Sequence, residues 1–314
     1  MDPARLLHDV LRKACSDARI EGVALSGGLD STIISHMLRD RRLPAVAVIS
    51  RDFVATDLTY CQAAAAAAGM RLSVAMPDTA ELLEGVSETV RMLGCFGEST
   101  IRNALVMYVA ISEAKRLGMA SLATGDGADE LFAGYGFLVR TDPAALRAEL
   151  DRLRGIMRFS SHTIGESLGV RIESPFLHPD VVRVASSLPP SQLVGEYGGT
   201  QAGKLILRRL FEGEIPQVIV RRPKAPMQDG AGTAGLKDLL ESLITDEVFA
   251  ERAGEILGRD GIRIRTKESL HYYEQYLRHF GPPEPARGGR TCPDCHCALR
   301  PGLRSCRMCG AFPV

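Results

Sequence analysis

Short apolar runs alternate with stretches of helical periodicity through the first 140 residues, and this alternation restricts the chain to few folds. The apolar runs are GVAL, AVAVIS, RLSVAM and ASLAT, at about 22–25, 45–50, 71–76 and 120–124. Helical patterns lie before and between them, at about 6–14, 32–38, 57–68, 79–93 and 101–117. Strands that alternate with helices favour a parallel sheet with helices on both faces. We therefore predict an α/β fold with a doubly wound parallel sheet.

Composition excludes several classes of protein. The chain has 314 residues with 38 basic and 38 acidic side chains, so its formal net charge is zero and nothing attracts it as a whole to nucleic acid or anionic lipid. No stretch approaches the roughly 18 uninterrupted apolar residues of a membrane-spanning helix. The first residues mix acids with bases and lack the apolar run of a signal peptide. We expect a cytoplasmic protein with no membrane association.

The hexapeptide SGGLDS follows the first predicted strand and opens a helix. Gly27 and Gly28 let the backbone turn tightly and point N–H groups at one spot, where the positive end of the helix adds to the attraction for phosphate. Ser26 and Ser31 add hydroxyl donors. Asp30 fits an anion site only if a divalent cation, naturally Mg²⁺, lies between it and the phosphates. The alternative is an ordinary strand–helix turn with a Ser/Asp cap.

A second acidic turn, GDGADELF, follows the fourth predicted strand. It places Asp126, Asp129 and Glu130 within five positions, and such close carboxylates require a cation or a basic substrate group between them. The carboxyl ends of neighbouring parallel strands share one crevice. Asp30 and Asp129 are therefore predicted to meet at one Mg²⁺–pyrophosphate unit. The alternative is an acid-rich helix N-terminus stabilised by the helix dipole.

SGGLDS followed by GDGADELFAGY resembles the synthetase domain of the glutamine-dependent asparagine synthetases, within the PP-loop ATP pyrophosphatase group. The likeness covers about residues 5–280 and includes SPFLHPDVV at 174–182, KLILRRL at 204–210 and IPQVIVRRPKAPMQDGAG at 215–232. It implies a PP-loop (adenine nucleotide alpha hydrolase-like) fold with helical additions. It also implies a ligase of amino-acid biosynthesis, in which ATP adenylates a carboxylate, pyrophosphate leaves, and ammonia or an amine attacks the acyl-adenylate.

The resemblance also implies roles for individual positions. The matched ATP-site positions are Leu25, Thr124 and Gly125 at the nucleotide, Ser26, Gly27, Gly28 and Ser31 at the pyrophosphate, and Asp30 and Asp129 at Mg²⁺. Lys224, in RRPKAPMQDG, matches the lysine that stabilises charge on the transferring phosphoryl group and the acyl-adenylate, which is a large catalytic effect. Lys204 is a second basic candidate. Asp126 would act on the incoming amine as a base or an orienting group.

Two departures from the family bear on the substrates. The chain reaches the phosphate loop by residue 26, without the glutaminase domain or its nucleophilic cysteine at position 2. Nitrogen is therefore expected from free ammonia, from a separate glutaminase subunit or from an amine on the substrate. The family's acid-then-arginine pair before PFL reads Arg171-Ile172-Glu173, with the charges reversed. Because these positions help to shape the acceptor site, the identity of the small-molecule carboxylate stays open.

The last residues carry five of the eight cysteines. Four of them form two C-x-x-C pairs with ten residues between, Cys292/Cys295 and Cys306/Cys309. Four thiolates on two tight turns predict a closed tetrahedral zinc site of structural type. Cys297 and His296 are left over and are expected to be spectators. Zinc would supply the folding energy of a tail too small for its own core.

The tail is basic, with five arginines from Arg287 onwards against the single acid Asp294. These arginines are Arg287, Arg290, Arg300, Arg304 and Arg307. A basic zinc ribbon on a linker indicates a nucleic-acid or protein partner, or it is a solvated cap. We predict an asparagine-synthetase-like domain at 1–235, its C-terminal helical part at 236–280, a Pro/Gly linker at 281–290 and a zinc ribbon at 291–314.

Two other functions fit parts of the sequence. One is a PP-loop enzyme that adenylates a tRNA base, for instance before thiolation, with the ribbon binding the RNA. The scattered cysteines, Cys15, Cys61 and Cys95, lack an obvious catalytic setting for this chemistry. The other is a catalytically silent nucleotide-binding regulator that uses the ribbon to recruit a partner. Retention of Asp30, Asp129 and Lys224 argues against it.

Overall fold

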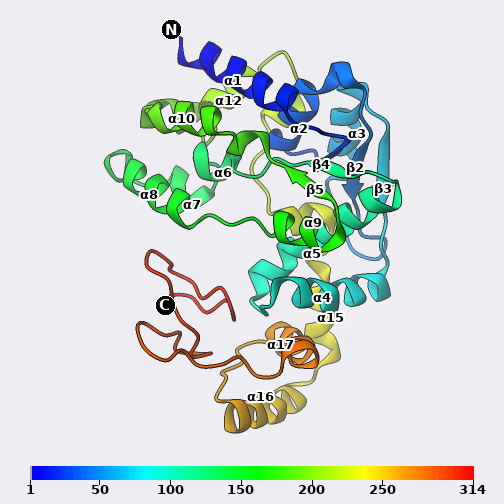
Figure 1. Cartoon of the computed structure of the whole chain (residues 1–314), viewed down its shortest axis with the longest axis vertical. Helices are drawn as coiled ribbons and strands as arrows, with labels where there is room; N and C mark the ends of the chain where they lie inside the picture. The colour runs from blue at the N-terminus through cyan, green and yellow to red at the C-terminus, as the bar shows by residue number, and fades with distance from the viewer. Residues whose placement is uncertain (1) are drawn as a thin grey trace.

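The computed structural model describes residues 2–314 and contains a five-stranded, all-parallel sheet (Figure 1). In chain order its strands are β1 (Gly22–Ala24), β2 (Ala45–Val48), β3 (Leu72–Ala75), β4 (Ser121–Ala123) and β5 (Arg171–Glu173). Their spatial order is β3-β2-β1-β4-β5, and Val23 of β1 pairs with both Ala45 of β2 and Ala123 of β4. The chain thus runs outward from β1 to β3 and returns to the other side of β1. The resulting switch point between β1 and β4 is where open α/β sheets bind ligands.

Helices cover both faces of this sheet, as predicted. The first half of the chain forms α1 (Pro3–Asp17), α2 (Leu29–Met37), η1 (Arg39–Arg41), α3 (Leu58–Ala67), α4 (Thr79–Leu93), α5 (Glu98–Arg116), α6 (Ala128–Leu131), α7 (Gly136–Val139) and α8 (Pro143–Ile156). The second half forms α9 (Ser160–Leu168), η2 (Pro175–Leu177), α10 (Pro179–Ser187), α11 (Pro190–Leu193), α12 (Leu205–Leu210), α13 (Gln217–Val220), α14 (Met227–Ala231), α15 (Gly235–Leu243), α16 (Asp246–Asp260) and α17 (Lys267–Phe280).

Alternate strand residues enter two separate cores. In β2, Ala45 belongs to the core under α1, α2 and α3, whereas Val46 and Val48 belong to the core under α5. In β4, Ala123 belongs to the first of these cores and Leu122 to the second. Successive strand side chains point to opposite faces, so short runs of small and β-branched residues fill both layers. This is the physical basis of the doubly wound arrangement.

The stretch from Asp142 to Lys224 is mostly helical, but it also contains strands. It contains the edge strand β5 and a small antiparallel hairpin of β6 (Gly195–Tyr197) and β7 (Thr200–Ala202). β5 has only three residues and pairs on one side, with β4. A short edge strand tolerates charged side chains. Because two of the three residues of β5 are charged, Arg171 and Glu173, no apolar run in the sequence indicates this strand.

A third core lies beneath the sheet domain, between α4, α15, α16, α17 and the C-terminal tail (Figure 1). Its buried members include Phe96, Tyr273 and the tail cysteines Cys292, Cys295 and Cys306. The prediction of a helix at 79–93 is confirmed by α4, and Thr266 caps the start of α17. Within residues 2–314, no helix is both long and apolar enough to span a bilayer.

Candidate active site

The phosphate loop between β1 and α2 is held by close packing against α3. Gly27 adopts a φ of +64°, and a Cβ atom there would lie 2.5 Å from Cβ of Tyr60 and 2.7 Å from the amide nitrogen of Cys61. Both facts require glycine. Oγ of Ser26 lies 3.1 Å from Oγ of Ser31, and this contact ties the start of the loop to the first turn of the helix.

Helix α2 begins without a side-chain cap. Its N-cap is Gly28, and the Thr32 hydroxyl donates to the Gly28 carbonyl at 2.8 Å. The first N–H groups of a helix have no intrahelical acceptor. With a glycine at the cap, they are left for an anion, which is the arrangement that binds phosphate at helix N-termini.

The second acidic turn packs directly on the first. A Cβ atom at Gly125 would lie 2.8 Å from Cβ of Asp30 and 3.2 Å from the amide nitrogen of Ser31. Thr124, one residue earlier, donates its N–H to the carbonyl of Glu173 at 2.9 Å. The loops after β1 and β4 are thus in contact, as expected for neighbouring strands at a switch point. Leu25, at the end of β1, is buried.

Lys204 joins the two turns. Its Nζ lies 2.5 Å from Oδ2 of Asp30 and 2.6 Å from Oδ1 of Asp129. Nζ of Lys224 lies 2.7 Å from Oδ2 of Asp129. The side chain of Lys204 is 4% exposed and that of Lys224 is 42% exposed. The sequence therefore identifies four residues that the fold brings together, and the deeper cation is Lys204.

The backbone around Lys204 is strained. Lys204 and Ala133 both have a φ of +57°, a region that non-glycine residues rarely adopt. The Lys204 N–H donates to the carbonyl of Phe132 at 2.8 Å, and a side chain at Gly203 would collide with the carbonyl of Ala133. Such strain persists only where the surrounding structure enforces it, and it concentrates at functional sites.

The pKa values of the two acids of this cluster are shifted in opposite directions. Burial alone would raise the pKa of Asp129, but Lys204 and Lys224 hold that pKa at about 2. The pKa of Asp30 is raised because burial outweighs the attraction of Lys204. The pKa of Lys224 is also raised, because its attraction to Asp129 and Asp30 exceeds the opposing effect of burial.

One oxygen in this cluster fits a metal ligand. Oδ1 of Asp30 is buried and has no hydrogen-bond partner among residues 2–314. An unsatisfied buried carboxylate oxygen is costly, and oxygen donors of this kind are what Mg²⁺ prefers. The donor set of Asp30 and Asp129 thus fits the predicted cation.

Asp126 lies at the far side of the second turn, in a network of hydroxyl groups. Its Oδ2 accepts from Oγ1 of Thr124 at 2.8 Å and from Oγ of Ser161 at 2.5 Å. Ser174 Oγ lies 3.0 Å from Thr124 Oγ1 and 2.9 Å from Nε2 of His162. Ser161 and His162 belong to α9 and were not identified from the sequence, since neither lies in a motif.

The reversed charge pair before PFL is an ion pair on the edge strand. Nε of Arg171 lies 2.6 Å from Oε1 of Glu173, and their side chains are 54% and 24% exposed. The Glu173 carbonyl also receives the Thr124 N–H. The pair is therefore next to the hydroxyl network, with its acid nearer to the site.

Arg222 is a further residue of the site that the sequence analysis missed. It donates from Nη1 to the Gly27 carbonyl at 3.2 Å, pairs with Asp57, and stacks over the ring of Tyr60 at 3.8 Å. Asp57 stands at the N-cap of α3, but its side chain caps no helical N–H because it binds Arg222. The one sequence feature that could have indicated Arg222 is its position two residues before Lys224.

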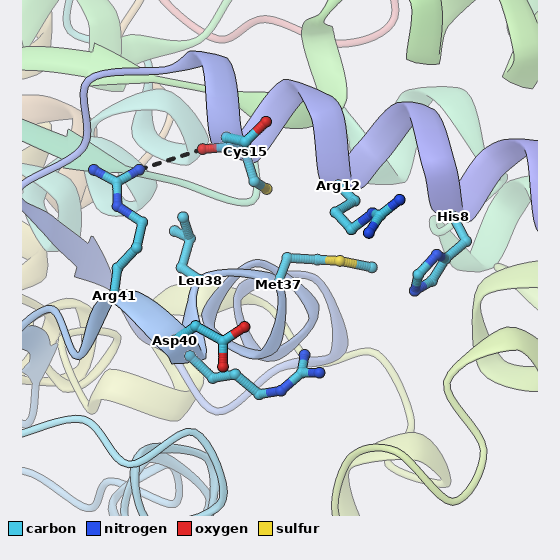
Figure 2. Close-up of a pocket in the computed structure, with 9 residues that line it drawn as sticks. His8, Arg12, Cys15, Met37, Leu38, Asp40 and Arg41 are labelled. Atoms are coloured by element: carbon cyan, nitrogen blue, oxygen red, sulfur yellow. Dashed lines mark hydrogen bonds between the residues drawn. The ribbon is translucent and has the colours of Figure 1, made fainter.

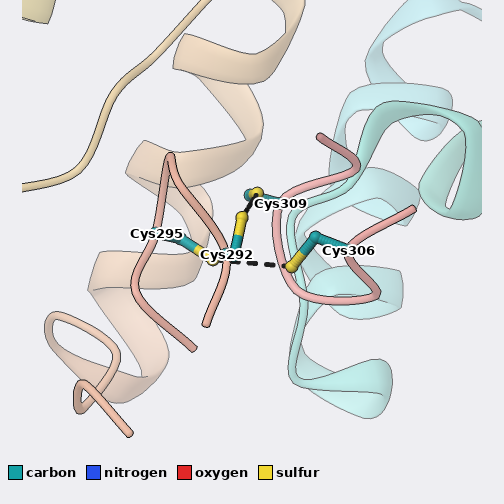
Figure 3. A group of neighbouring side chains, drawn as sticks. All are labelled: Cys292, Cys295, Cys306 and Cys309. Carbon is teal, nitrogen blue, oxygen red and sulfur yellow. Dashed lines mark hydrogen bonds between the residues drawn. The ribbon is translucent and has the colours of Figure 1, made fainter. Parts of the chain in front are cut away.

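The four cysteines of the tail form one cluster (Figure 3). Their sulfur atoms lie within 4.8 Å of one another, with Cys292 Sγ 3.5 Å from Cys309 Sγ and Cys295 Sγ 3.5 Å from Cys306 Sγ. All are free thiols. Sulfurs at about 2.3 Å from a tetrahedral zinc ion are separated by about 3.8 Å, so the cluster fits zinc. Cys297 is outside the group.

A hollow of about 370 Å³ lies elsewhere, between α1 and η1 (Figure 2). Its lining includes His8, Arg12 and Arg41. Nη1 of Arg41 donates to the carbonyls of Cys15 and Ala18 at the end of α1, at 3.3 and 3.2 Å. None of the predicted site residues lines this hollow, and Arg41 acts in it as a helix C-cap.

Comparisons with known proteins point to one family. The model for asparagine synthase matches residues 4–163 and 158–280. Asparagine synthetase [glutamine-hydrolyzing] 1 from Lotus japonicus is 25% identical over 325 residues, covering 92% of this chain and 54% of that protein. The asparagine synthetase [glutamine-hydrolyzing] from Cricetulus griseus is 27% identical over 301 residues, covering 88% and 52%. The chain spans about half the length of these curated relatives.

Among solved structures, NMN synthetase from Francisella tularensis is 14% identical and covers 92% of this chain and 99% of its own. The TM-score is 0.39, a likeness too slight to bear on fold or function.

Proposed function

Because the chain belongs to the asparagine synthase family, we propose that it is an ATP-dependent carbon–nitrogen ligase that releases AMP and pyrophosphate. The carboxylate oxygen of an acceptor attacks the α-phosphorus of ATP and pyrophosphate leaves. A nitrogen nucleophile then attacks the acyl carbon, loses a proton and displaces AMP. The observation that carries this proposal is the junction of the two turns, where Lys204 contacts both Asp30 and Asp129.

The phosphate loop binds the leaving pyrophosphate in this proposal. The N-terminal turn of α2 supplies N–H donors and the positive end of its dipole, and Ser26 and Ser31 supply hydroxyls. Leu25, Thr124 and Gly125 line the nucleotide. Arg222 stabilises the conformation of the loop because it donates a hydrogen bond to the Gly27 carbonyl.

Asp30 and Asp129 would hold Mg²⁺, whose contribution is to neutralise charge on the triphosphate. The lysines act on the same charge. Lys224 is half exposed and paired with one acid only, so it is free to meet the phosphoryl group and the acyl-adenylate. Lys204 is fixed between the two acids and keeps the turns together while adding positive potential.

The acceptor and the nitrogen nucleophile would meet at Asp126. Hydroxyl donors from Thr124 and Ser161 orient its carboxylate, which makes it fit to accept a proton from, or align, an incoming amine. The Arg171–Glu173 ion pair beside it favours an acceptor other than the aspartate suggested by the family default. The nitrogen source is free ammonia, a separate glutaminase subunit or a substrate amine.

We further propose a structural zinc ion at Cys292, Cys295, Cys306 and Cys309. It supports the ribbon and takes no part in ligation. Burial raises the pKa of Cys15 and Cys61 to about 12 and that of Cys95 to about 11. Thiols held this firmly protonated make poor nucleophiles, which counts against the tRNA-thiolation alternative.

The test is exchange of labelled pyrophosphate into ATP, with AMP release measured in parallel, across a panel of carboxylates that includes aspartate. Exchange is expected with at least one carboxylate in the absence of ammonium, and net AMP only when ammonium or an amine is added. Asp30→Asn, checked for folding by circular dichroism, is the inactive control. Folded chain that binds ATP but gives neither exchange nor AMP with any acceptor would favour the silent regulator instead.

A further inference from the structure

The cysteine tail contacts the end of α8 through three arginine interactions. Arg152 donates from Nη1 to the carbonyl of Gly302 at 2.7 Å, and Arg304 lies 3.0 Å from the carboxylate of Glu149. Arg307 donates to the carbonyl of Ile156, the last residue of α8. No N–H group of α8 donates to that carbonyl, because the last four carbonyls of a helix have no intrahelical partner. The ribbon therefore supplies the missing hydrogen bond at the C-terminus of α8.

The end of α8 leads directly to the acceptor side of the site. Only three residues separate Ile156 from α9, which begins at Ser160. The next residue, Ser161, is buried and donates to Asp126, and His162 contacts Ser174. The other end of this path is the metal cluster itself, because Arg307 follows Cys306 immediately in sequence.

The ribbon is also fixed on its opposite side, so it can serve as a frame. Phe96 donates its N–H to the Met308 carbonyl at 2.8 Å, and a Cβ at Gly97 would lie 2.9 Å from the Gly310 nitrogen. Asp294, between the first two cysteines, receives both Nε and Nη2 of Arg265, at 2.5 and 2.8 Å. Figure 1 shows this tail between α17 and α8.

We propose that the zinc-bound ribbon positions the acceptor side of the active site, with Arg307 as the positioning residue. By holding the Ile156 carbonyl, Arg307 fixes the short α8–α9 connection and thereby the distance between Ser161 and Asp126. The proposal rests on the proposed function in giving Asp126 and the four cysteines their roles. It reassigns two of the ribbon's basic residues, Arg304 and Arg307, from nucleic-acid binding to contacts within the chain.

The test is hydrogen–deuterium exchange of the full-length, zinc-loaded chain, with zinc content measured for every variant. Arg307→Gln is compared with Arg290→Gln, whose side chain makes no hydrogen bond or ion pair within residues 2–314. A charge-assisted hydrogen bond is lost in the first variant only, so the hydrogen-bonded amides of α9, at 163–168, are expected to exchange about tenfold faster there. Zinc content and Mg·ATP affinity are expected to stay unchanged in both.

A second arm removes zinc by chelation from the wild-type chain and is expected to speed exchange in the same segment. Neither arm depends on ligase turnover, so their outcome is separate from that of the proposed activity. The proposal is overturned if 163–168 exchanges at the wild-type rate in zinc-loaded Arg307→Gln, or if chelation loosens 291–314 while leaving 163–168 protected. A ligase assay, once an acceptor is found, should show a raised acceptor KM with the KM for ATP unchanged.

Discussion

Gly125 and Asp30 lie so close that a single added methyl group would push them apart: a Cβ on Gly125 would sit 2.8 Å from Cβ of Asp30. These residues belong to the loops after β4 and β1, so their contact sets the spacing at the switch point of the sheet. Everything proposed for the ATP site depends on this spacing, since Asp129 reaches Lys204 and Asp30 only when the two loops touch.

We therefore predict that Gly125→Ala separates the loops and lowers pyrophosphate exchange by about 10²-fold, the cost of a displacement on the order of 1 Å at reacting groups. Gly155→Ala is the matched control, because a Cβ at Gly155 in α8 meets nothing within 4 Å. It should keep full activity and gain roughly 0.4–1 kcal/mol of stability from a less flexible unfolded chain. Equal activity in both variants would contradict the role of the contact.

Substitution of Lys204 or Lys224 by methionine should have different effects, mainly on stability for Lys204 and mainly on activity for Lys224. Lys204→Met leaves Asp30 and Asp129 buried without their shared cation, and removing one partner of a buried pair costs about 3–5 kcal/mol of unfolding free energy. Lys224 is 42% exposed, so Lys224→Met should cost less than about 1 kcal/mol while lowering AMP formation by about 10²–10³-fold. Urea denaturation and AMP assays measure the two effects. Exposed Lys237→Met is the control, and a Lys224→Met enzyme of normal activity would remove that lysine from the mechanism.

Motif and periodicity were sufficient to predict what lies at the switch point, but not what supports it. SGGLDS and GDGADELF each follow a strand, and parallel topology alone brings Asp30 and Asp129 to one edge. Arg222, Ser161 and β5 could not be predicted in this way. Their positions follow from tertiary packing, in which a stacked guanidinium, a hydroxyl and a three-residue edge strand leave no periodic pattern in the chain.

The basic tail shows the same limit in a different form. Its two C-x-x-C pairs predict a four-sulfur site, and the structure brings the four sulfurs together. Occupation of this site by zinc stays a prediction. Its arginines suggest an external partner only while the tail is imagined on a linker. Arg304 and Arg307 bind α8 instead, because an unsatisfied helix C-terminus and the partly buried Glu149 compete for them.

Zinc should bind at one ion per chain, and its binding should stabilise the rest of the chain as well as the ribbon. Cys295→Ser removes a buried ligand, so we expect loss of the metal and a lowered Tm, since the thiolates provide folding energy only when coordinated. Cys297→Ser is the matched control from the same turn, and it should keep both the zinc, measured by mass spectrometry, and the Tm. Retention of zinc by Cys295→Ser together with its loss from Cys297→Ser would mean that the ligand set is different.

His36, on α2 near the hollow, should make stability depend on pH. Burial and Arg39, whose Nη1 lies 3.0 Å from Nε2 of His36, lower its pKa, although Glu214 and its hydrogen bond oppose this effect and His8 adds to it. The unfolded chain therefore binds a proton on His36 more readily than the folded chain does. The stability from the neutral ring is complete above the unfolded pKa of about 6.5 and is lost as the pH falls below it toward the lower folded value. His36→Gln should flatten the fall in unfolding free energy between about pH 7 and pH 5 relative to the wild type. An unchanged slope in His36→Gln would show that the folded chain binds this proton as readily as the unfolded one.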